Sequence, residues 1–219
     1  MISENRLILI EGLPGVGKTT LAERLTEHFE GRGKPCICLY ENDQPHPLQP
    51  PWHDDPQQMA ARFVECWRDY FSSHSSTNDL IIAEAALFQT VARVLLQQSL
   101  AAPLIDRCLL ELSAVLEPHC PLLIHFNQVE SRSHTQQLCR ERGRSWTSFL
   151  VEVTTRNQYA ASRGYEDFAG VLQFMADYQR RSEHWFEVWP LQKIQLSHHA
   201  DWEQLYRELG NELGLAEAL

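Results

Sequence analysis

The sequence of 219 residues predicts a single α/β domain, residues 1–219, in which a mostly parallel sheet is covered by helices on both faces. Short apolar runs alternate along the chain with longer stretches that have helical periodicity. A glycine-rich segment joins the first apolar run to the first helical stretch. Apolar residues make up 43% of the chain, as in folded globular proteins.

The opening unit follows from residue spacing. Residues 6–11 (RLILIE) are a short apolar run that ends at a glycine, as expected of a buried parallel strand. Residues 19–29 carry apolar side chains at helical spacing, and Gly31 and Gly33 provide a stop. Residues 35–40 (PCICLY) read as the second strand. The predicted order is therefore strand, glycine loop, helix, strand.

A proline-rich loop, residues 41–55, separates the second strand from the next helix. Asp55 is the expected N-cap of that helix, and Pro56 suits its first position. The later predicted elements, in chain order, are a strand at 79–84, two helical segments split by Pro103 and ending near Pro118, a strand at 121–126, an arginine-rich segment, helices at about 147–163 and 167–188, a strand at 193–196 and a helix at 201–213.

Composition and charge exclude several classes of protein. The net charge of −10 opposes nonspecific binding to a phosphate backbone, so we expect no nucleic-acid partner. No apolar stretch approaches the length of a membrane helix, and the N-terminal apolar run is too short for a signal peptide. The six cysteines lack zinc-like spacing and indicate reduced thiols. These features favour a cytoplasmic protein without a membrane partner.

Basic charge is concentrated in one segment. Residues 130–163 hold six arginines and three glutamates, a net charge of +3, which leaves −13 for the rest of the chain. The segment contains no lysine. The only basic patch of the sequence is therefore local and made of arginine.

The glycine-rich segment is the strongest functional motif. Gly12, Gly17, Lys18 and Thr19 match the phosphate-loop pattern G-x-x-x-x-G-K-[ST], with a predicted strand before it and a helix after it. Backbone N–H groups of such a loop face phosphate oxygens, the lysine reaches the β- and γ-phosphates, and the threonine hydroxyl binds Mg²⁺. The predicted nucleotide contacts are Gly12, Leu13, Pro14, Gly15, Val16, Gly17, Lys18, Thr19 and Thr20.

The order of the elements resembles that of the small P-loop kinases, in particular the thymidylate and deoxynucleoside kinases. The matching features are GLPGVGKTT after the first strand, Glu41 after the second, Glu84 at the end of the third and an arginine-rich segment after the fourth. The segments LILIEGLPG, PLLIHF and ERGRSW are also similar to uncharacterised bacterial P-loop NTPase or kinase-like proteins. The resemblance implies a three-layer P-loop NTPase fold, a five-stranded sheet of order 2-3-1-4-5 and a lid that closes over ATP.

The resemblance has one notable departure. The related kinases carry an acidic residue followed by arginine at the end of the third strand, whereas here Ala85 follows Glu84. The region expected to form the acceptor site, residues 41–71, begins with a loop that holds four carboxylates and no lysine or arginine. We therefore expect a neutral or cationic small-molecule acceptor; Arg62 and Arg68, on the following helix, are the main counterargument.

Two glutamates are candidate catalytic groups. Glu84 stands at the carboxyl end of a strand beside the loop and could hold a water on Mg²⁺, contact the acceptor or merely cap the next helix. Glu41 could accept the proton of an attacking hydroxyl, or it could be a solvated loop residue. Thr19 and Glu84 are thus the expected metal side, and Lys18, Glu41, Glu84 and Arg142 the expected catalytic set.

The lid is predicted at about residues 130–145. Guanidinium groups stabilise the charge that spreads over a transferring phosphoryl group, so Arg140, Arg142 and Arg144 are candidate phosphate contacts, with Arg142 preferred. The alternative is that these arginines lie on a solvent-exposed helix face and contact no phosphate. Among the histidines, adjacent His198 and His199 indicate a surface position rather than a metal pair, and His46 and His53 are weak candidates for substrate contact.

Together these features predict an ATP- and Mg²⁺-dependent phosphotransferase that acts on a hydroxyl of a small molecule. ATP is favoured over GTP because the N-K-x-D motif that reads guanine is missing from the sequence. The alternative is a regulatory or binding P-loop NTPase that hydrolyses nucleotide without an acceptor. Lid arginines and an enclosed acceptor crevice would favour the first.

Overall fold

The computed structural model describes residues 5–75, 77–127, 130–197 and 202–212, and within them an all-parallel sheet has the strand order β2-β3-β1-β4-β5. The strands are β1 (Leu7–Glu11), β2 (Cys36–Leu39), β3 (Leu80–Glu84), β4 (Pro121–Asn127) and β5 (Lys193–Ser197). The predicted fold class and strand order are confirmed.

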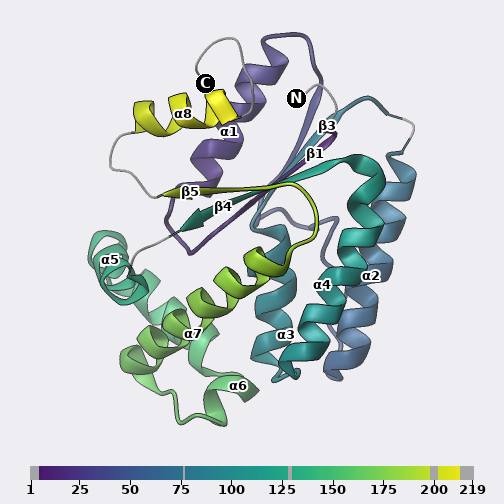
Figure 1. Cartoon of the computed structure of the whole chain (residues 1–219). Coiled ribbons are helices and arrows are strands. Elements are labelled where there is room, and N and C mark those ends of the chain that lie inside the picture. Colours follow the sequence, from purple (N-terminus) through teal and green to yellow (C-terminus); the bar gives the residue numbers. More distant parts are fainter. Residues whose placement is uncertain (1–4, 76, 128–129, 198–201, 213–219) are drawn as a thin grey trace.

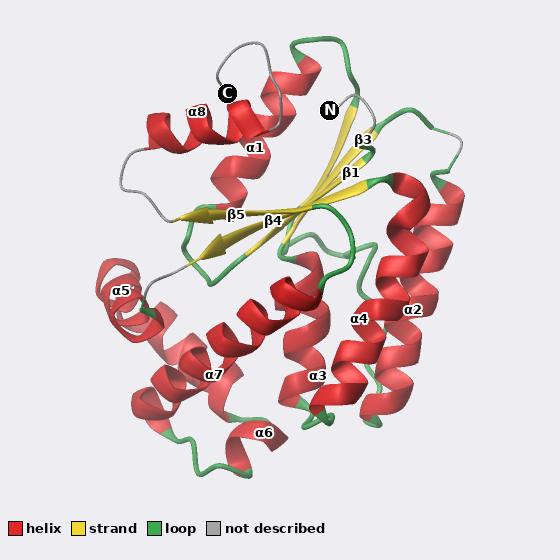
Figure 2. Ribbon diagram, in the orientation of Figure 1, coloured by secondary structure: helices red, strands yellow, loops and turns green. Residues whose placement is uncertain are grey.

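Helices cover both faces of the sheet and form three layers with it (Figures 1 and 2). The helices are α1 (Lys18–Glu30), α2 (Pro56–Ser73), α3 (Arg93–Gln97), α4 (Ala102–Leu116), α5 (Ser131–Thr155), α6 (Gln158–Ala161), α7 (Asp167–Val188) and α8 (Trp202–Glu212), with a π-helix η2 (Ala86–Ala92) and a short 3₁₀ helix η3 (Glu117–His119). Figure 1 shows α1 and α8 on one side of the sheet and α2, α3, α4 and α7 on the other.

The central strands are buried along their whole length. All five residues of β1 and all five of β3 are buried, because each strand has a neighbouring strand on either side and helices above and below. Trp67 of α2 and Trp185 of α7 are among the largest fully buried side chains, and both helices lie on the same face of the sheet. This burial keeps the strand ends, and the loops that leave them, in fixed positions.

The start of α2 agrees with the sequence prediction. Asp55 accepts hydrogen bonds from the backbone N–H groups of Gln57 (2.8 Å) and Gln58 (3.2 Å), and Pro56 occupies the first turn. The cap ends the proline-rich loop at a defined residue. The loop is further tied to α3, because the Gln98 side chain donates to the carbonyl of His53 at 2.7 Å.

The arginine-rich segment differs from its prediction. It is helical from Ser131 onward, because the Glu130 carboxylate accepts from the N–H groups of Arg132 and Ser133 and so caps α5. The predicted helix at 147–163 is therefore wrong at both ends: α5 ends at Thr155, and Asn157 caps the separate helix α6. Within α5, Gly143 has φ 83° and ψ −174°, which breaks the helix into two parts.

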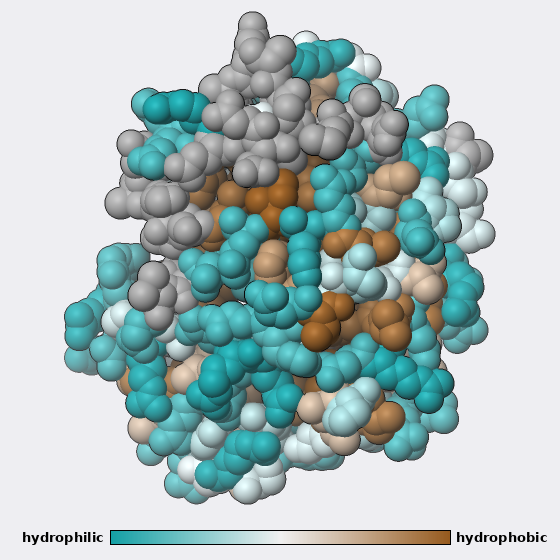
Figure 3. Space-filling model, in the orientation of Figure 1, coloured by the Kyte–Doolittle hydropathy of each residue, from teal (hydrophilic) through white to brown (hydrophobic). Residues whose placement is uncertain are grey.

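The face of the molecule seen in Figure 3 is mostly polar, with apolar surface over α4 and near the end of α7. Leu110 of α4 and Val188 of α7 contribute to it, with 59% and 52% of their surface exposed. None of the helices in the described part of the chain combines the length and hydrophobicity needed to span a lipid bilayer.

Candidate active site

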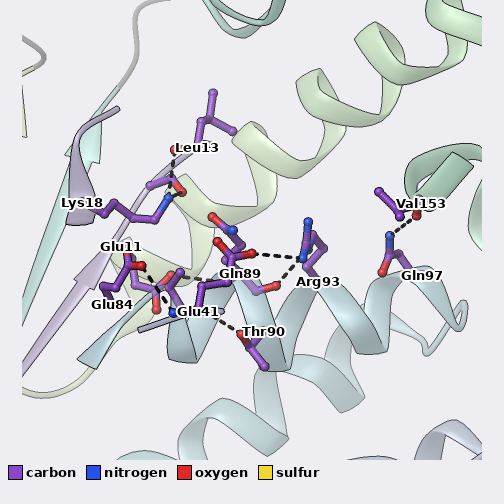
Figure 4. A network of polar contacts seen from close by, with 12 residues as sticks. Glu11, Leu13, Lys18, Glu41, Glu84, Gln89, Thr90, Arg93, Gln97 and Val153 are labelled. Carbon is purple, nitrogen blue, oxygen red and sulfur yellow. Dashed lines mark hydrogen bonds and ion pairs between the residues drawn. The ribbon is translucent and has the colours of Figure 1, made fainter. Parts of the chain in front are cut away.

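The candidate catalytic groups meet at one edge of the sheet. Ile10 of β1 is the register partner of Glu84 of β3, and Glu41 follows β2, which pairs with the far side of β3. Because the strands are parallel, their carboxyl ends lie at the same edge. Figure 4 shows the result: Lys18 lies above Glu84, and Glu41 and Arg93 follow to the right of Glu84.

The phosphate loop needs glycine for both conformation and space. Gly12 and Gly17 have φ values of 149° and 95°, in a region that other residues rarely adopt. A Cβ atom at Gly17 would lie 2.0 Å from the Trp202 ring of α8, and one at Gly12 would lie 2.9 Å from Phe126 Cβ. The loop is therefore packed between its neighbours at both ends.

Lys18 is folded over this loop. Its ammonium donates to the carbonyls of Gly12 (3.2 Å) and Leu13 (3.0 Å), and only 5% of the residue is exposed. Burial lowers the pKa of Lys18, while the Glu41 and Glu84 carboxylates oppose that shift. The loop thus carries a desolvated cation at the position where the motif places the β- and γ-phosphates.

Glu84 connects the phosphate loop to the loop that follows β2. The Thr19 hydroxyl donates to Glu84 Oε2 at 3.1 Å, and the backbone N–H of Glu41 donates to Glu84 Oε1 at 3.3 Å. Glu84 is 3% exposed, so both carboxylate oxygens are engaged inside the protein. A hydroxyl and a carboxylate at this separation are hard oxygen donors of the kind that Mg²⁺ prefers.

Arg93 is a site residue that the sequence analysis missed. Its Nη2 lies 3.7 Å from Glu41 Oε1, and its Nε donates to the carbonyl of Gln89 at 2.9 Å. Arg93 begins α3, at the end of the π-helix that follows β3. Arg93 thus brings a guanidinium to Glu41 from eight residues beyond Ala85. Only the presence of an arginine in the helix after β3 could have indicated it.

Two further buried ionisable groups lie at the carboxyl ends of β1 and β4. Glu11 and His125 are register partners, and each is at most 2% exposed. Burial raises the pKa of Glu11 to about 7, against the hydrogen bond from the Leu87 N–H and the charge of Lys18. Burial lowers the pKa of His125 to about 4, and Lys18 adds to this shift. Neither group was among the predicted site residues.

The first part of α5 packs on the tip of the phosphate loop. His134 Nε2 donates to the carbonyl of Pro14 at 2.8 Å, and the Leu138 side chain lies against Gly15. Residues 134, 138 and 142 are spaced by four, so Arg142 lies on the same side of α5 as His134 and Leu138. The predicted lid thus contacts the phosphate loop through His134 and Leu138, two contacts that the sequence did not reveal.

The lid arginines themselves are exposed. The Arg142 guanidinium lies 5.0 Å from the centre of the Trp146 ring, and Arg140 lines a surface hollow with Thr147 and Phe168. Within the described residues, Arg140, Arg142 and Arg144 form no ion pair with any carboxylate. Their role as phosphate contacts stays a prediction.

The proline-rich loop, residues 41–55, engages most of its carboxylates in hydrogen bonds with nearby residues. Asp43 accepts from the Tyr40 N–H (2.8 Å), Asp54 from the Trp52 indole (2.9 Å), and Asp55 caps α2. The Arg62 side chain donates to the carbonyl of Pro51. Glu41 is therefore the loop carboxylate that the structure places beside Lys18 and Arg93.

The two histidines that were weak candidates for substrate contact, His46 and His53, accept hydrogen bonds within their own loop. His46 is buried, and its Nδ1 accepts from the Leu48 N–H within the loop. His53 Nδ1 likewise accepts from the Asp55 N–H. Both rings thus have local structural contacts, and His198 and His199 lie outside the described residues. Among the residues that the structure describes, no three His, Cys, Asp or Glu side chains are grouped to hold a metal ion.

No protein-family model matches this chain, and no curated protein matches it either. Solved structures do match. The thymidylate kinase of Ehrlichia chaffeensis has a TM-score of 0.52 at 14% identity, over 96% of this chain and 99% of that one. The thymidylate kinase of Candida albicans also has a TM-score of 0.52 at 14% identity, over 96% and 92%.

A deoxyadenosine kinase of M. mycoides, solved with bound dATP, has a TM-score of 0.49 at 12% identity, over 95% of this chain and 99% of that one. The similarity to the two thymidylate kinases shows that this chain has a thymidylate kinase-like fold along nearly its whole length.

Proposed function

We propose that this chain is an ATP- and Mg²⁺-dependent phosphotransferase that moves the γ-phosphate of ATP to a hydroxyl group of a small molecule. The observation that carries the proposal is the continuous set of contacts from Thr19 through Glu84 to Glu41 and Arg93, beside Lys18. It joins the loop that would hold the donor to a carboxylate that could serve the acceptor.

The donor side follows from the phosphate loop. Oxygens of the β- and γ-phosphates would replace the Gly12 and Leu13 carbonyls as partners of the Lys18 ammonium. Thr19 and Glu84 fit a Mg²⁺ ion, the first through its hydroxyl and the second through a bound water. The ion would neutralise charge on the phosphates. Arg142 would add a guanidinium from the lid.

On the acceptor side, we assign the role of general base to Glu41. One oxygen of Glu84 accepts from the Thr19 hydroxyl and the other from the Glu41 N–H. A carboxylate held in this way suits a fixed position beside the metal ion. Glu41 would take the proton of the acceptor hydroxyl as the hydroxyl oxygen bonds to the γ-phosphorus and the bond from that phosphorus to the β,γ-bridging oxygen breaks. ADP then leaves with that oxygen.

We further propose a neutral or cationic acceptor. A nucleoside monophosphate would bring about two negative charges and would need unpaired cations to offset them. Arg93 reaches the acceptor side, where Glu41 already neutralises it at 3.7 Å, and Arg62 donates to the Pro51 carbonyl of the loop. Lys18 would bind the donor phosphates and would not be free to bind an acceptor phosphate. An acceptor that is neutral or carries an ammonium group therefore suits the charges that remain on the acceptor side.

The test is a substrate screen with Mg·ATP. Wild-type protein and Lys18→Ala would be incubated with nucleoside monophosphates in one panel and with nucleosides, amino sugars and peptide antibiotics in another. We expect a phosphate adduct, detected by mass, in the second panel only and with the wild type only. Diphosphate formation from a monophosphate would contradict the acceptor class, and ATP loss without any adduct would favour the hydrolytic alternative.

A further inference from the structure

Glu11 is a buried carboxylate for which the proposed reaction has no role. It ends β1, immediately before the first glycine of the phosphate loop, and none of its surface is exposed. The other four residues of β1 are apolar. Because a buried carboxylate is strongly unfavourable without partners, its contacts must explain its presence.

Those contacts cap the π-helix. Glu11 Oε1 accepts from the Leu87 N–H at 2.6 Å and Oε2 from the Gln89 N–H at 3.1 Å. The first N–H groups of a helix have no partner within the helix. Ala85, the residue before η2, has a left-handed φ of 58° and no side-chain oxygen to cap it. The cap of η2 therefore comes from β1.

The same helix turn holds Arg93. Gln89 donates its N–H to Glu11 and accepts at its carbonyl from Arg93 Nε at 2.9 Å. Arg93 in turn faces Glu41. Figure 4 shows Glu11, Gln89, Arg93 and Glu41 in this arrangement. The backbone of Gln89 thus connects Glu11, which precedes the phosphate loop, to Arg93. Such π-helical turns occur often at functional sites.

We propose that Glu11 is a positioning residue: by capping η2 it sets where Arg93 stands against Glu41. The inference rests on the proposed phosphotransfer, since it assigns Glu11 to the acceptor side of that reaction. Glu11 forms no hydrogen bond with Lys18, with Thr19 or with the loop carbonyls within the described residues, although its charge acts on Lys18. Its loss should therefore impair acceptor turnover and change the binding of Mg·ATP only slightly.

The first experiment needs no acceptor. Glu11→Gln keeps the size of the side chain but turns an amide N–H₂ toward the backbone N–H groups, and Glu111→Gln, at an exposed carboxylate of α4, is the matched control. We expect the Leu87 and Gln89 amides to exchange hydrogen about tenfold faster or more in Glu11→Gln, as one lost hydrogen bond would allow. The Kd for Mg·ATP should stay within about threefold, because the phosphate contacts are unchanged.

The second experiment separates positioning from plain stability. With an acceptor from the screen, Glu11→Gln should lower kcat/KM for the acceptor about tenfold or more and leave KM for Mg·ATP unchanged. Glu11→Asp, which keeps the charge on a shorter side chain, should lose less. In an Arg93→Met background, Glu11→Gln should cost nothing further, because its effect passes through Arg93.

Three results would overturn the proposal: unchanged exchange at Leu87 and Gln89, a loss of protection spread equally over α2 and α4, or losses for Glu11→Gln and Arg93→Met that simply multiply. If Glu11→Gln does not fold, Glu11→Asp carries the exchange measurement. Failure of every acceptor with the wild-type protein would count against the phosphotransferase function, whereas the exchange measurement would still decide whether Glu11 holds η2.

Discussion

Replacing His125 by phenylalanine should change how the stability of the protein depends on pH. His125 is 2% exposed, and neither ring nitrogen has a hydrogen-bond partner among the residues that the structure describes. The ring stacks on Phe186, with 5.3 Å between centroids, and meets Phe88 edge to face at 5.9 Å. Phenylalanine fits this aromatic setting and cannot be protonated.

The magnitude follows from proton linkage. The pKa of His125 falls from 6.5 to about 4 in the folded protein. Between these values the unfolded chain binds a proton that the native state does not, so the stability is present above pH 6.5 and is lost as pH falls toward 4. A shift of this size corresponds to about 3 kcal/mol. The two unpartnered nitrogens should make His125→Phe more stable by a further ~1–3 kcal/mol at every pH.

The assay is urea unfolding of both proteins at several pH values between 7 and 4. The difference in unfolding free energy should grow by about 3 kcal/mol on acidification, because titration of all other groups cancels in the comparison. Glu11 provides a contrast of opposite sign: its pKa is raised to about 7, so its contribution is lost as pH rises from about 4.5 to 7, and Glu11→Gln should remove that loss. Parallel stability curves for wild type and His125→Phe would refute the reasoning.

The remaining predictions concern activity and the lid. Lys18→Ala should abolish phosphoryl transfer and leave the circular dichroism spectrum unchanged; undiminished turnover would remove the phosphate loop from the mechanism. Glu41→Gln and Glu84→Gln should each lower kcat about 10²-fold, and full activity in Glu41→Gln would move the base to Glu84 or eliminate it. Residues 130–145 should gain hydrogen-exchange protection when a nonhydrolysable Mg·ATP analogue binds, and equal protection with and without it would count against a lid.

Most of the fold could be predicted because its signals are local. Apolar runs such as residues 121–126 are short, bounded by turn residues and buried on both faces, and each became a parallel strand. The start of α2 followed from Asp55 and Pro56, whose capping chemistry acts within one turn. The extent of α5 did not follow, because its exposed polar sequence and Gly143 gave no helical period before residue 147.

The site could be predicted only where a motif specifies it. The loop residues 12–20, Glu41 and Glu84 were predicted from a motif and from strand ends; the structure places Thr19, Glu84 and Glu41 together, and their roles stay predictions. Arg93 and Glu11 were missed because their roles depend on the π-helix, and ALFQTVA has no pattern that separates a π-helix from an α-helix. His134 and Leu138 meet the phosphate loop only through the tertiary placement of α5, which no local pattern encodes.

Isotope tracing tests the central claim most directly. The protein would be incubated with Mg²⁺, the acceptor found in the screen and ATP labelled with ¹⁸O on its γ-phosphate. The products would then be separated, and their masses would be measured by mass spectrometry. Phosphotransfer predicts that the labelled phosphoryl group appears on the acceptor in equal amount to ADP, and that Lys18→Ala forms neither product. Label found only in inorganic phosphate, with the acceptor unchanged, would contradict the account.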